Sequence, residues 1–465
     1  MIAPNEDSWT AGPKKKWLVV GGGMMGLKQA YDLVRRGQDV TIAEAAPQFG
    51  GLTSVWKLDD VTWDRYYHAT LMSDTRLRAL LEDIDLQDQL RWVTTKTGFY
   101  TDGELYSMSD TSEFLKFPPL NIFQKLRLGG TIFYASRIRN WKRLEKLHVS
   151  DWLRRWSGNA VFEKIWQPLL RAKLGESYKK TSAAFIWAHT SRMYKARRSG
   201  MKTEMFGYVP GGYASILQRL QEVLREEGVR LLADHPVKEI VSMRDENLEH
   251  EGPHLRVNYG DGRVDFFDNV LLTIPSPVIA EICPGLSEEE KSRHRGIEYL
   301  GVVCTSLLTK KSISPYYVTN ITDTWVPLTG VIEMSRIVDS ESQLGGQHLI
   351  YLPKYLHQDD PGFGESDAEI EERCLETLEK MYDHFSRDDV SAIKTSRSKY
   401  VMALPTLRYS ERLPPVVTTV PGLYAPNAAH IVKGNLNVNE TIDLGEEKLR
   451  EDVWPDFLAR SNADA

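Results

Sequence analysis

The sequence contains few cysteines and no long apolar run. Cys283, Cys304 and Cys374 are the only cysteines in 465 residues, and their spacing fits neither a disulfide framework nor a zinc motif. We expect buried or inert thiols in a reducing compartment. No run reaches the roughly 18 apolar residues that a membrane-spanning helix requires, and residues 1–17 lack the apolar core of a secretory signal. The sequence therefore predicts a cytoplasmic protein, which could still rest peripherally on a membrane.

The sequence also lacks an excess of charge of either sign. Its formal net charge of −6 provides no overall attraction to nucleic acid, so any basic patch must be local. Hydrophobic residues make up 42% and charged residues 26%, which is typical of a soluble globular protein. A chain of 465 residues can bury a large core and should form two or more domains.

Glycine, by contrast, is concentrated near the N-terminus. Residues 17–30 read WLVVGGGMMGLKQA, an apolar run typical of a buried parallel strand, followed by a helix that should end near Gly37. Gly21, Gly23 and Gly26 have G-x-G-x-x-G spacing in the turn between them. The first permits the turn, the second lets a diphosphate approach the backbone, and the third lets the helix pack on the strand. The N–H groups at the helix start would face the phosphates.

A second predicted strand, DVTIAE, ends in a carboxylate at Glu44. An acidic residue about twenty positions beyond the glycine turn accepts hydrogen bonds from the adenosine ribose and repels a 2′-phosphate. The sequence thus predicts a dinucleotide site that does not take NADP. No second G-x-G-x-x-G occurs, which argues against a separate NAD(P)H site.

A paired glycine, Gly50 and Gly51 in EAAPQFGGLTS, follows directly after this acidic strand. Here the sequence resembles the superfamily of FAD-dependent amine oxidases, phytoene desaturases and protoporphyrinogen oxidases, and most of all its protoporphyrinogen-oxidase-like branch. In that superfamily the paired glycine wraps the flavin diphosphate and ribityl chain. The usual arginine ahead of the pair is missing, and Pro47-Gln48-Phe49 stands there instead.

Five further segments resemble the superfamily in its own order: 63–74, 208–220, 228–240, 270–282 and 421–447. They imply that the backbone of Val237 contacts adenine, and that Asn427 stands where the family usually has an acid near the ribityl chain. They also imply a C-terminal helix whose capping box begins at Asn437 and whose dipole faces the flavin. The resemblance implies noncovalent FAD, since no cysteine follows Cys374 to attach it. The cofactor-binding residues it implies are Gly21, Gly23, Met25, Gly26, Glu44, Gly50, Gly51, Leu52, Val237, Thr273, Asn427 and Asn439.

The predicted fold class is α/β, with a discontinuous Rossmann-type FAD-binding domain and a second, substrate domain. The FAD-binding domain should comprise residues 15–75, 205–285 and 400–460. Two inserts, 76–204 and 286–399, should form the substrate domain. The first reads as mostly helical and the second contains strand-like runs.

The candidate catalytic residues come from two segments of the chain. The resemblance places RYYHAT beside the flavin ring, so His68 would orient substrate or move a proton, and Tyr67 would line the same wall. Arg171 and Lys173, in WQPLLRAKLGE, could hold an anionic group of the substrate. The alternatives are a purely structural hydrogen bond for His68, core packing for Tyr67, and solvent exposure for Arg171 and Lys173. His430 is a weaker candidate of the same kind as His68.

One departure from the family concerns the lysine that amine oxidases carry on a strand of the substrate domain, bridged by water to the flavin. The matching stretch here is YLGVVCTSLLTKK, with Cys304 near that position and lysines only at its far end. This argues against amine oxidation and favours a branch that dehydrogenates C–C or C–O bonds.

Residues 114–147 carry eight lysines and arginines against a single acid, Glu145, with apolar and aromatic residues between them. This pattern is typical of a basic face that rests on anionic lipid. It is equally typical of a helical lobe with a buried apolar side and a solvated basic side, which we favour from sequence. Nucleic-acid binding is disfavoured, because no recognised module accompanies the charges.

The leading hypothesis is an FAD-dependent oxidase or dehydrogenase. It would move a hydride from a mid-sized organic substrate to flavin N5 and pass the electrons to O₂ or another acceptor. The alternative is a non-redox flavoenzyme of the UDP-galactopyranose mutase type, with Arg171 and Arg408 as candidates for binding a nucleotide-sugar diphosphate. A flavin-binding protein without catalysis is a third class. No metal site is expected, and nothing in the sequence indicates the oligomeric state.

Overall fold

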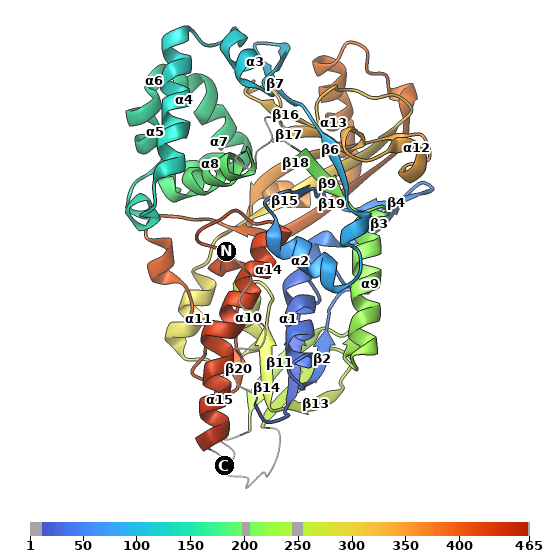
Figure 1. The fold of residues 1–465 in the computed structure, drawn as a ribbon, viewed down its shortest axis with the longest axis vertical. Helices are drawn as coiled ribbons and strands as arrows, with labels where there is room; N and C mark the ends of the chain where they lie inside the picture. The colour runs from blue at the N-terminus through green and yellow to red at the C-terminus, as the bar shows by residue number, and fades with distance from the viewer. Residues whose placement is uncertain (1–11, 198–204, 244–253, 464–465) are drawn as a thin grey trace.

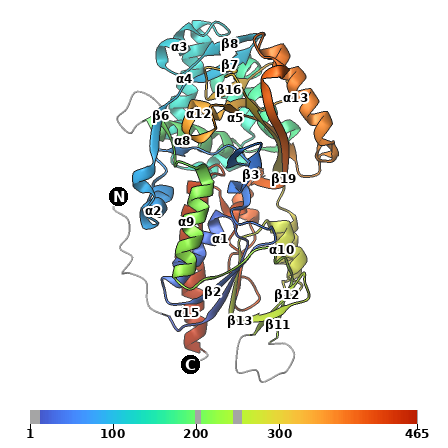
Figure 2. The same cartoon turned by 90° about the vertical axis from the view of Figure 1, so that its right-hand side faces the viewer.

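A computed structural model describes residues 12–197, 205–243 and 254–463 (Figure 1). The molecule is elongated, with a parallel sheet towards one end and a second sheet beside a helical lobe at the other (Figures 1 and 2). Residues 1–11, within the stretch predicted not to be a secretory signal, lie outside the described residues. Across the described part of the chain, no helix is long and apolar enough to cross a membrane.

The parallel sheet is assembled from three separated parts of the sequence. Its strand order is β10-β2-β1-β14-β20, and every neighbouring pair is parallel. Residues 16–43 supply the two central strands, and later segments add the others on either side. The strands are β1 (Lys16–Val20), β2 (Asp39–Ala43), β10 (Arg230–Leu232), β14 (Asn269–Leu272) and β20 (Leu423–Tyr424).

Both faces of this sheet are covered, which explains why its strands read as continuous apolar runs. Trp17 and Val19 pack against helices on one face, and Leu18 and Val20 pack against a small antiparallel sheet on the other. The helices are α1 (Met24–Val34), α9 (Gly212–Glu226), α14 (Val438–Lys448) and α15 (Trp454–Ala463). The small sheet comprises β11 (Val237–Ser242), β12 (Leu255–Tyr259) and β13 (Val264–Phe267).

The second large sheet is mixed, with strand order β19-β15-β18-β17-β16-β7-β8. Its longest fully buried strand is β15, which lies between β19 and β18, and α13 (Asp367–Met381) covers one face through Ile370, Cys374 and Leu378. The strands are β15 (Tyr299–Thr309), β16 (Val318–Ile321), β17 (Gly330–Glu333), β18 (His348–His357), β19 (Val390–Ala403), β7 (Thr97–Thr101) and β8 (Glu104–Ser107).

The strands β7 and β8 depart from the expectation that residues 76–204 are mostly helical. Asp102 and Gly103 form the two-residue loop between them, with φ of 56° and 76°. An Asp-Gly loop with both residues at positive φ suits the twist of a hairpin, and aromatic residues at 99 and 100 favour a strand. This hairpin signal was present in the sequence and was missed. β6 (Arg91–Thr94) also lies in this range, in a three-stranded sheet with β5 (Thr70–Leu71) and β9 (Met205–Tyr208).

The rest of residues 111–197 forms the helical lobe, at the upper left of Figure 1. Its core contains Leu153, Phe162 and Trp187. The helices are α3 (Thr111–Lys116), α4 (Ile122–Arg137), α5 (Val149–Ser157), α6 (Asn159–Val161), α7 (Gln167–Leu174) and α8 (Ala183–Arg197). Elsewhere lie α2 (Thr75–Asp83), α10 (Ser276–Ile282), α11 (Glu288–Arg295), α12 (Ser340–Gln343), β3 (Val55–Leu58) and β4 (Val61–Asp64).

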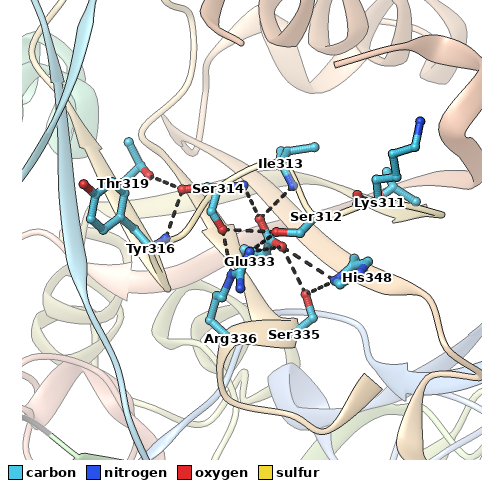
Figure 3. Close-up of polar contacts among 11 residues, drawn as sticks. Lys311, Ser312, Ile313, Ser314, Tyr316, Thr319, Glu333, Ser335, Arg336 and His348 are labelled. Atoms are coloured by element: carbon cyan, nitrogen blue, oxygen red, sulfur yellow. Dashed lines mark hydrogen bonds and ion pairs between the residues drawn. The ribbon is translucent and has the colours of Figure 1, made fainter. Parts of the chain in front are cut away.

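A buried glutamate fixes one end of the mixed sheet (Figure 3). The Glu333 side chain is fully buried and accepts hydrogen bonds from the N–H groups of Ile313 (3.1 Å) and Ser314 (2.6 Å). Arg336 and His348 lie 3.7 and 3.8 Å from the same carboxyl, and burial raises its pKa. One side chain therefore ties the loop after β15 to the end of β17.

Glu333→Ala should lower the free energy of unfolding by about 2–6 kcal/mol. The substitution leaves two buried N–H groups without an acceptor, and each such group costs about 1–3 kcal/mol. Urea denaturation measures the change. The matched control is Glu341→Ala on α12, where the side chain is exposed and a change within about 0.5 kcal/mol is expected. Equal effects of the two substitutions would contradict this account of the loop.

Candidate active site

The turn after β1 brings backbone groups unusually close together. Gly21 has φ of +106°, and a side chain there would lie 2.7 Å from Thr273 Oγ1. A side chain at Gly26 would overlap the Gly21 carbonyl oxygen. Gly23 differs, because its φ is −73° and no atom lies within 4 Å of the place where its Cβ would be. Gly21 and Gly26 therefore serve the packing of α1 on β1, while Gly23 leaves an open space at the helix start.

The paired glycine lies directly against this turn. Gly50 N donates to Gly22 O (2.7 Å), and Gly23 and Gly50 form an isolated parallel bridge. Gly50 and Gly51 have φ of +122° and +57°, which side chains rarely adopt. Gly22 also has a reason to be glycine, since a side chain there would overlap the ring of Phe49. The two glycine segments thus form one backbone cradle.

Glu44 is held at the edge of this cradle by backbone donors. Its Oε2 accepts from Gly22 N (2.6 Å) and its Oε1 from Ala46 N (2.8 Å). Each carboxylate oxygen retains a further lone pair. The side chain is therefore fixed in place and still able to accept a hydrogen bond from a ribose hydroxyl.

Three predicted cofactor residues have side chains that bond the protein's own backbone. Thr273 Oγ1 donates to Val20 O (3.0 Å), Asn427 Oδ1 accepts from Ala429 N (2.9 Å), and Asn439 Oδ1 accepts from Arg76 N (2.9 Å). They support the turn after β1, a short turn near residue 428 and the start of α2. Their contact with a cofactor stays a prediction. So do the roles of the buried Met25 and of the half-buried Leu52 and Val237.

The C-terminal helix begins where the sequence predicts. Asn437 is the residue before α14, and its Oδ1 accepts from Glu440 N (3.0 Å). α14 packs against α1, so the helix that follows the glycine turn and the C-terminal helix are neighbours. Positive helix-end dipoles of this kind favour negative charge nearby.

His68 lies in a wall of aromatic side chains and is neutral at physiological pH. Its Nδ1 donates to Tyr66 O (3.0 Å), because a carbonyl can only accept, and this leaves Nε2 with a lone pair. Its ring lies 5.0 Å from that of Tyr213, and burial lowers its pKa to about 4. The imidazole therefore does not titrate between pH 6 and 8, where the sequence suggested that it would, and instead offers Nε2 as an acceptor.

Asp64, four residues earlier, was not singled out from the sequence. It is buried, its Oδ2 lies 3.9 Å from His68 Nδ1, and its Oδ1 accepts from Tyr213 N (2.8 Å) at the start of α9. Burial raises its pKa to about 8. A buried carboxyl is a signal that a single sequence does not give, because an aspartate at the end of an exposed strand looks the same.

Lys173 and Tyr67 are brought together by a tyrosine that the sequence did not reveal. Tyr67 and Tyr355 share a hydrogen bond between their hydroxyls (2.9 Å), and Lys173 Nζ lies 3.2 Å from the centroid of the Tyr355 ring. No carboxylate of the described residues lies within 4.0 Å of this ammonium group. Lys173 is thus an unpaired cation in a partly enclosed place.

A shallow recess lies between the helical lobe and the C-terminal segment that precedes α14. Ala184 and Ala188 of α8 line one side, and Gly434 and Asn435 line another. His189 extends this wall, with its Nδ1 at 3.2 Å from Asn435 Nδ2. The recess therefore lies between a helix of the lobe and the approach to α14.

The remaining candidates lie elsewhere. Arg171 is exposed and pairs with Glu176 (2.9 Å). His430 is buried, with both ring nitrogens near backbone carbonyls of Asn427 and Pro414. Cys304 is fully buried in β15, and burial raises the pKa of its thiol. No cluster of three possible metal ligands occurs among the residues that the structure describes.

The cradle fits a flavin dinucleotide, because it combines open space at Gly23, a held carboxylate at Glu44 and the N-terminus of α1. The fold and site thus define a flavin-binding α/β protein. The sequence model of the family "flavin containing amine oxidoreductase" matches residues 24–430, and the chain belongs to that family. It is an FAD-dependent oxidoreductase, and both the predicted family and the α/β fold class are confirmed.

Curated relatives match over limited stretches. The zeta-carotene desaturase of Synechocystis sp. is 23% identical over 246 residues, which are 48% of this chain and 50% of that protein. The carotenoid phi-ring synthase of Chlorobaculum tepidum is 42% identical over 45 residues, 10% of this chain and 7% of that protein. The matches therefore span half or less of these relatives.

Solved structures match over almost the whole chain. A putative protoporphyrinogen oxidase from Exiguobacterium sp. 255-15 has a TM-score of 0.72 at 19% identity, with 96% of this chain and 100% of that chain covered. A CLA-producing fatty acid isomerase from P. acnes has a TM-score of 0.69 at 12% identity, with 95% and 100% covered. At such identities the likeness shows a shared fold.

Gly23→Val should fold and lose FAD, because its side chain would enter the open space that the diphosphate needs. Gly26→Ala should instead destabilise the protein, because its Cβ overlaps the Gly21 carbonyl. Flavin absorbance of the purified protein and its melting temperature separate the two effects. Gly129→Ala in α4 is the control, since nothing lies within 4 Å of its Cβ position. A Gly23→Val protein that is folded and fully loaded with FAD would contradict the location of the site.

Proposed function

We propose that the protein binds FAD noncovalently and oxidises a mid-sized organic substrate that carries an anionic group. The single observation that carries this proposal is Lys173, an ammonium group without a carboxylate partner that contacts the Tyr355–Tyr67 pair on the substrate side. A cation in a partly enclosed place without a counterion favours a ligand of opposite charge.

When bound, the flavin supplies the acceptor for a hydride, and O₂ or another acceptor then takes the electrons. The chain's own residues orient the substrate and exclude water. His68 offers Nε2, which is neutral and can accept a hydrogen bond or a proton from a substrate O–H or C–H group. Lys173 holds the anionic group, and Tyr67 and Tyr355 form the wall between them.

Amine oxidation is not the activity that these residues support best. Cys304 stands on β15 near the position where the sequence resemblance expects a lysine, and Lys310 and Lys311 lie at the far end, at Asp388 and Asp389. Lys173 reaches the substrate side from α7 and contacts a tyrosine ring. Dehydrogenation of a C–C or C–O bond therefore fits this wall better.

A mutase that uses a nucleotide-sugar diphosphate is disfavoured by the positions of its two candidate arginines. Arg171 is exposed beside Glu176, and Arg408 is exposed with Glu411 at 3.7 Å. Both side chains are solvent-exposed and have an acidic partner, unlike Lys173. The diphosphate would therefore lack the cationic partners that the sequence suggested.

Anaerobic mixing with a panel of candidate substrates tests the proposal. Carboxylate-bearing alcohols and compounds with a saturated C–C bond should bleach the flavin, whereas their methyl esters, NADH and NADPH should do so slowly or not at all. Lys173→Gln should raise KM for the carboxylates at least about tenfold and leave kcat within a few-fold, since one charge-assisted contact is worth about 1.5–3 kcal/mol. Arg171→Gln, on the same helix, is the control and should change neither constant. Equal bleaching by acids and esters would contradict an anionic substrate, and rapid reduction by NADPH would reveal a second nucleotide site.

His68→Ala should keep FAD and its melting temperature and slow flavin reduction by about 10²–10⁴-fold, the usual contribution of a proton-transfer group. The wild-type rate should be flat from about pH 5 to 7, because burial lowers the pKa of His68 to about 4 and raises the pKa of the neighbouring Asp64 to about 8. His384→Ala, at an exposed histidine, is the control. A decrease in rate of less than about tenfold would indicate that His68 serves packing. If the variant lost FAD or failed to fold, His68 would be structural and its proposed role in the reaction would be wrong.

A further inference from the structure

Exposed apolar side chains are concentrated on the helical lobe. Eight of the eleven exposed large hydrophobic side chains in the described parts of the chain lie between residues 115 and 156. Five of them belong to α4, and Phe123 is 76% exposed. Most soluble proteins do not gather exposed apolar groups in this way without a partner. The five on α4 are Ile122, Phe123, Leu126, Phe133 and Tyr134.

These five residues lie on one face of α4. At 3.6 residues per turn, positions 122, 123, 126, 133 and 134 fall within about a third of the helix circumference. The opposite face, with Leu128, Thr131 and Ala135, is buried in the lobe. The lobe thus has a buried apolar side, as the favoured interpretation of the sequence expects. Its outward side, however, is apolar as well as basic. Trp156 of α5 adds to this outward face, with its ring 4.1 Å from that of Tyr134.

Basic side chains without acidic partners surround this apolar face. Arg127 and Arg137 lie on α4 itself, and four more bases follow in residues 139–146; all six are exposed. No carboxylate of the described residues lies within 4.0 Å of any of them. Glu145, the acid nearest in sequence, is buried and accepts from Ser410 instead. The four that follow α4 are Arg139, Lys142, Arg143 and Lys146.

We propose that the outward face of α4, with Trp156 and the basic residues 137–146, docks on the surface of an anionic lipid bilayer. A helix of 16 residues is about 24 Å long and can lie in the interface plane with its apolar side towards the acyl chains. Tyr134 and Trp156 have the apolar body and polar tip that suit this depth. The bases then contact lipid phosphates.

The charge pattern favours lipid over the other possible occupants. A second copy of the chain, related by a two-fold axis, would bring the same unpaired bases against one another. A nucleic acid would satisfy the bases and leave Ile122 and Leu126 uncovered. Only an anionic surface with an apolar interior satisfies both parts of the face. The inference is independent of the flavin and of the substrate.

Co-sedimentation of the FAD-loaded protein with vesicles tests the proposal. The protein should bind phosphatidylcholine vesicles that contain phosphatidylglycerol, bind pure phosphatidylcholine far less, and dissociate as salt rises. Phe123→Asp/Leu126→Asp should abolish binding. Phe266→Asp is the matched control, because Phe266 is 46% exposed on β13 at the opposite end of the molecule (Figure 1).

A second pair of variants tests the charges. Each lysine near an anionic membrane surface contributes about fivefold in affinity. Lys142→Gln/Lys146→Gln should therefore weaken binding by about 30-fold. Lys57→Gln/Lys399→Gln removes two exposed lysines elsewhere and should leave binding unchanged.

Three results would overturn the proposal. The first is no binding to either vesicle, and the second is equal binding to both. The third is a concentration-dependent dimer in sedimentation velocity that Phe123→Asp/Leu126→Asp abolishes, which would assign the face to a second copy of the chain.

Discussion

The architecture depends on one close approach of backbone to backbone, at the turn between β1 and α1. Gly26 lies so near the Gly21 carbonyl that a single added carbon would overlap it, and Gly50 donates to Gly22 O (2.7 Å). This approach places the start of α1 directly beside the end of β1 in the parallel sheet. Strands from residues 230–232, 269–272 and 423–424 then extend that sheet, so distant parts of the chain converge on one cradle.

The parts that the sequence predicted are those encoded over short distances. The glycine turn, the carboxylate at Glu44 and the start of α14 at Asn437 each follow from residues within one strand, turn or helix. The contacts of the proposed substrate wall, Tyr67 and Tyr355, do not follow from such short segments. Tyr67 and Tyr355 are 288 positions apart, and the contact forms only when the loop before β5 packs against β18. The buried state of Asp64 likewise arises from α9, which begins at residue 212.

The helical lobe connects the two proposed functions of the molecule. α8 packs against α4 and α5, and its residues Ala184 and Ala188 line the recess near residues 428–436. A surface that holds the lobe at a bilayer would therefore hold one wall of the recess there too.

The central claim is that the cradle holds the adenosine diphosphate half of a flavin dinucleotide. Titration of the apoprotein with FAD and with FMN, followed by flavin fluorescence, tests it most directly, because FMN lacks the adenosine and one of the two phosphates. The account predicts that FMN binds at least about 100-fold more weakly than FAD, equivalent to about 2.7 kcal/mol. It also predicts that Glu44→Ala narrows the difference, since Glu44 is positioned for the adenosine ribose. Equal affinities for FAD and FMN would contradict it.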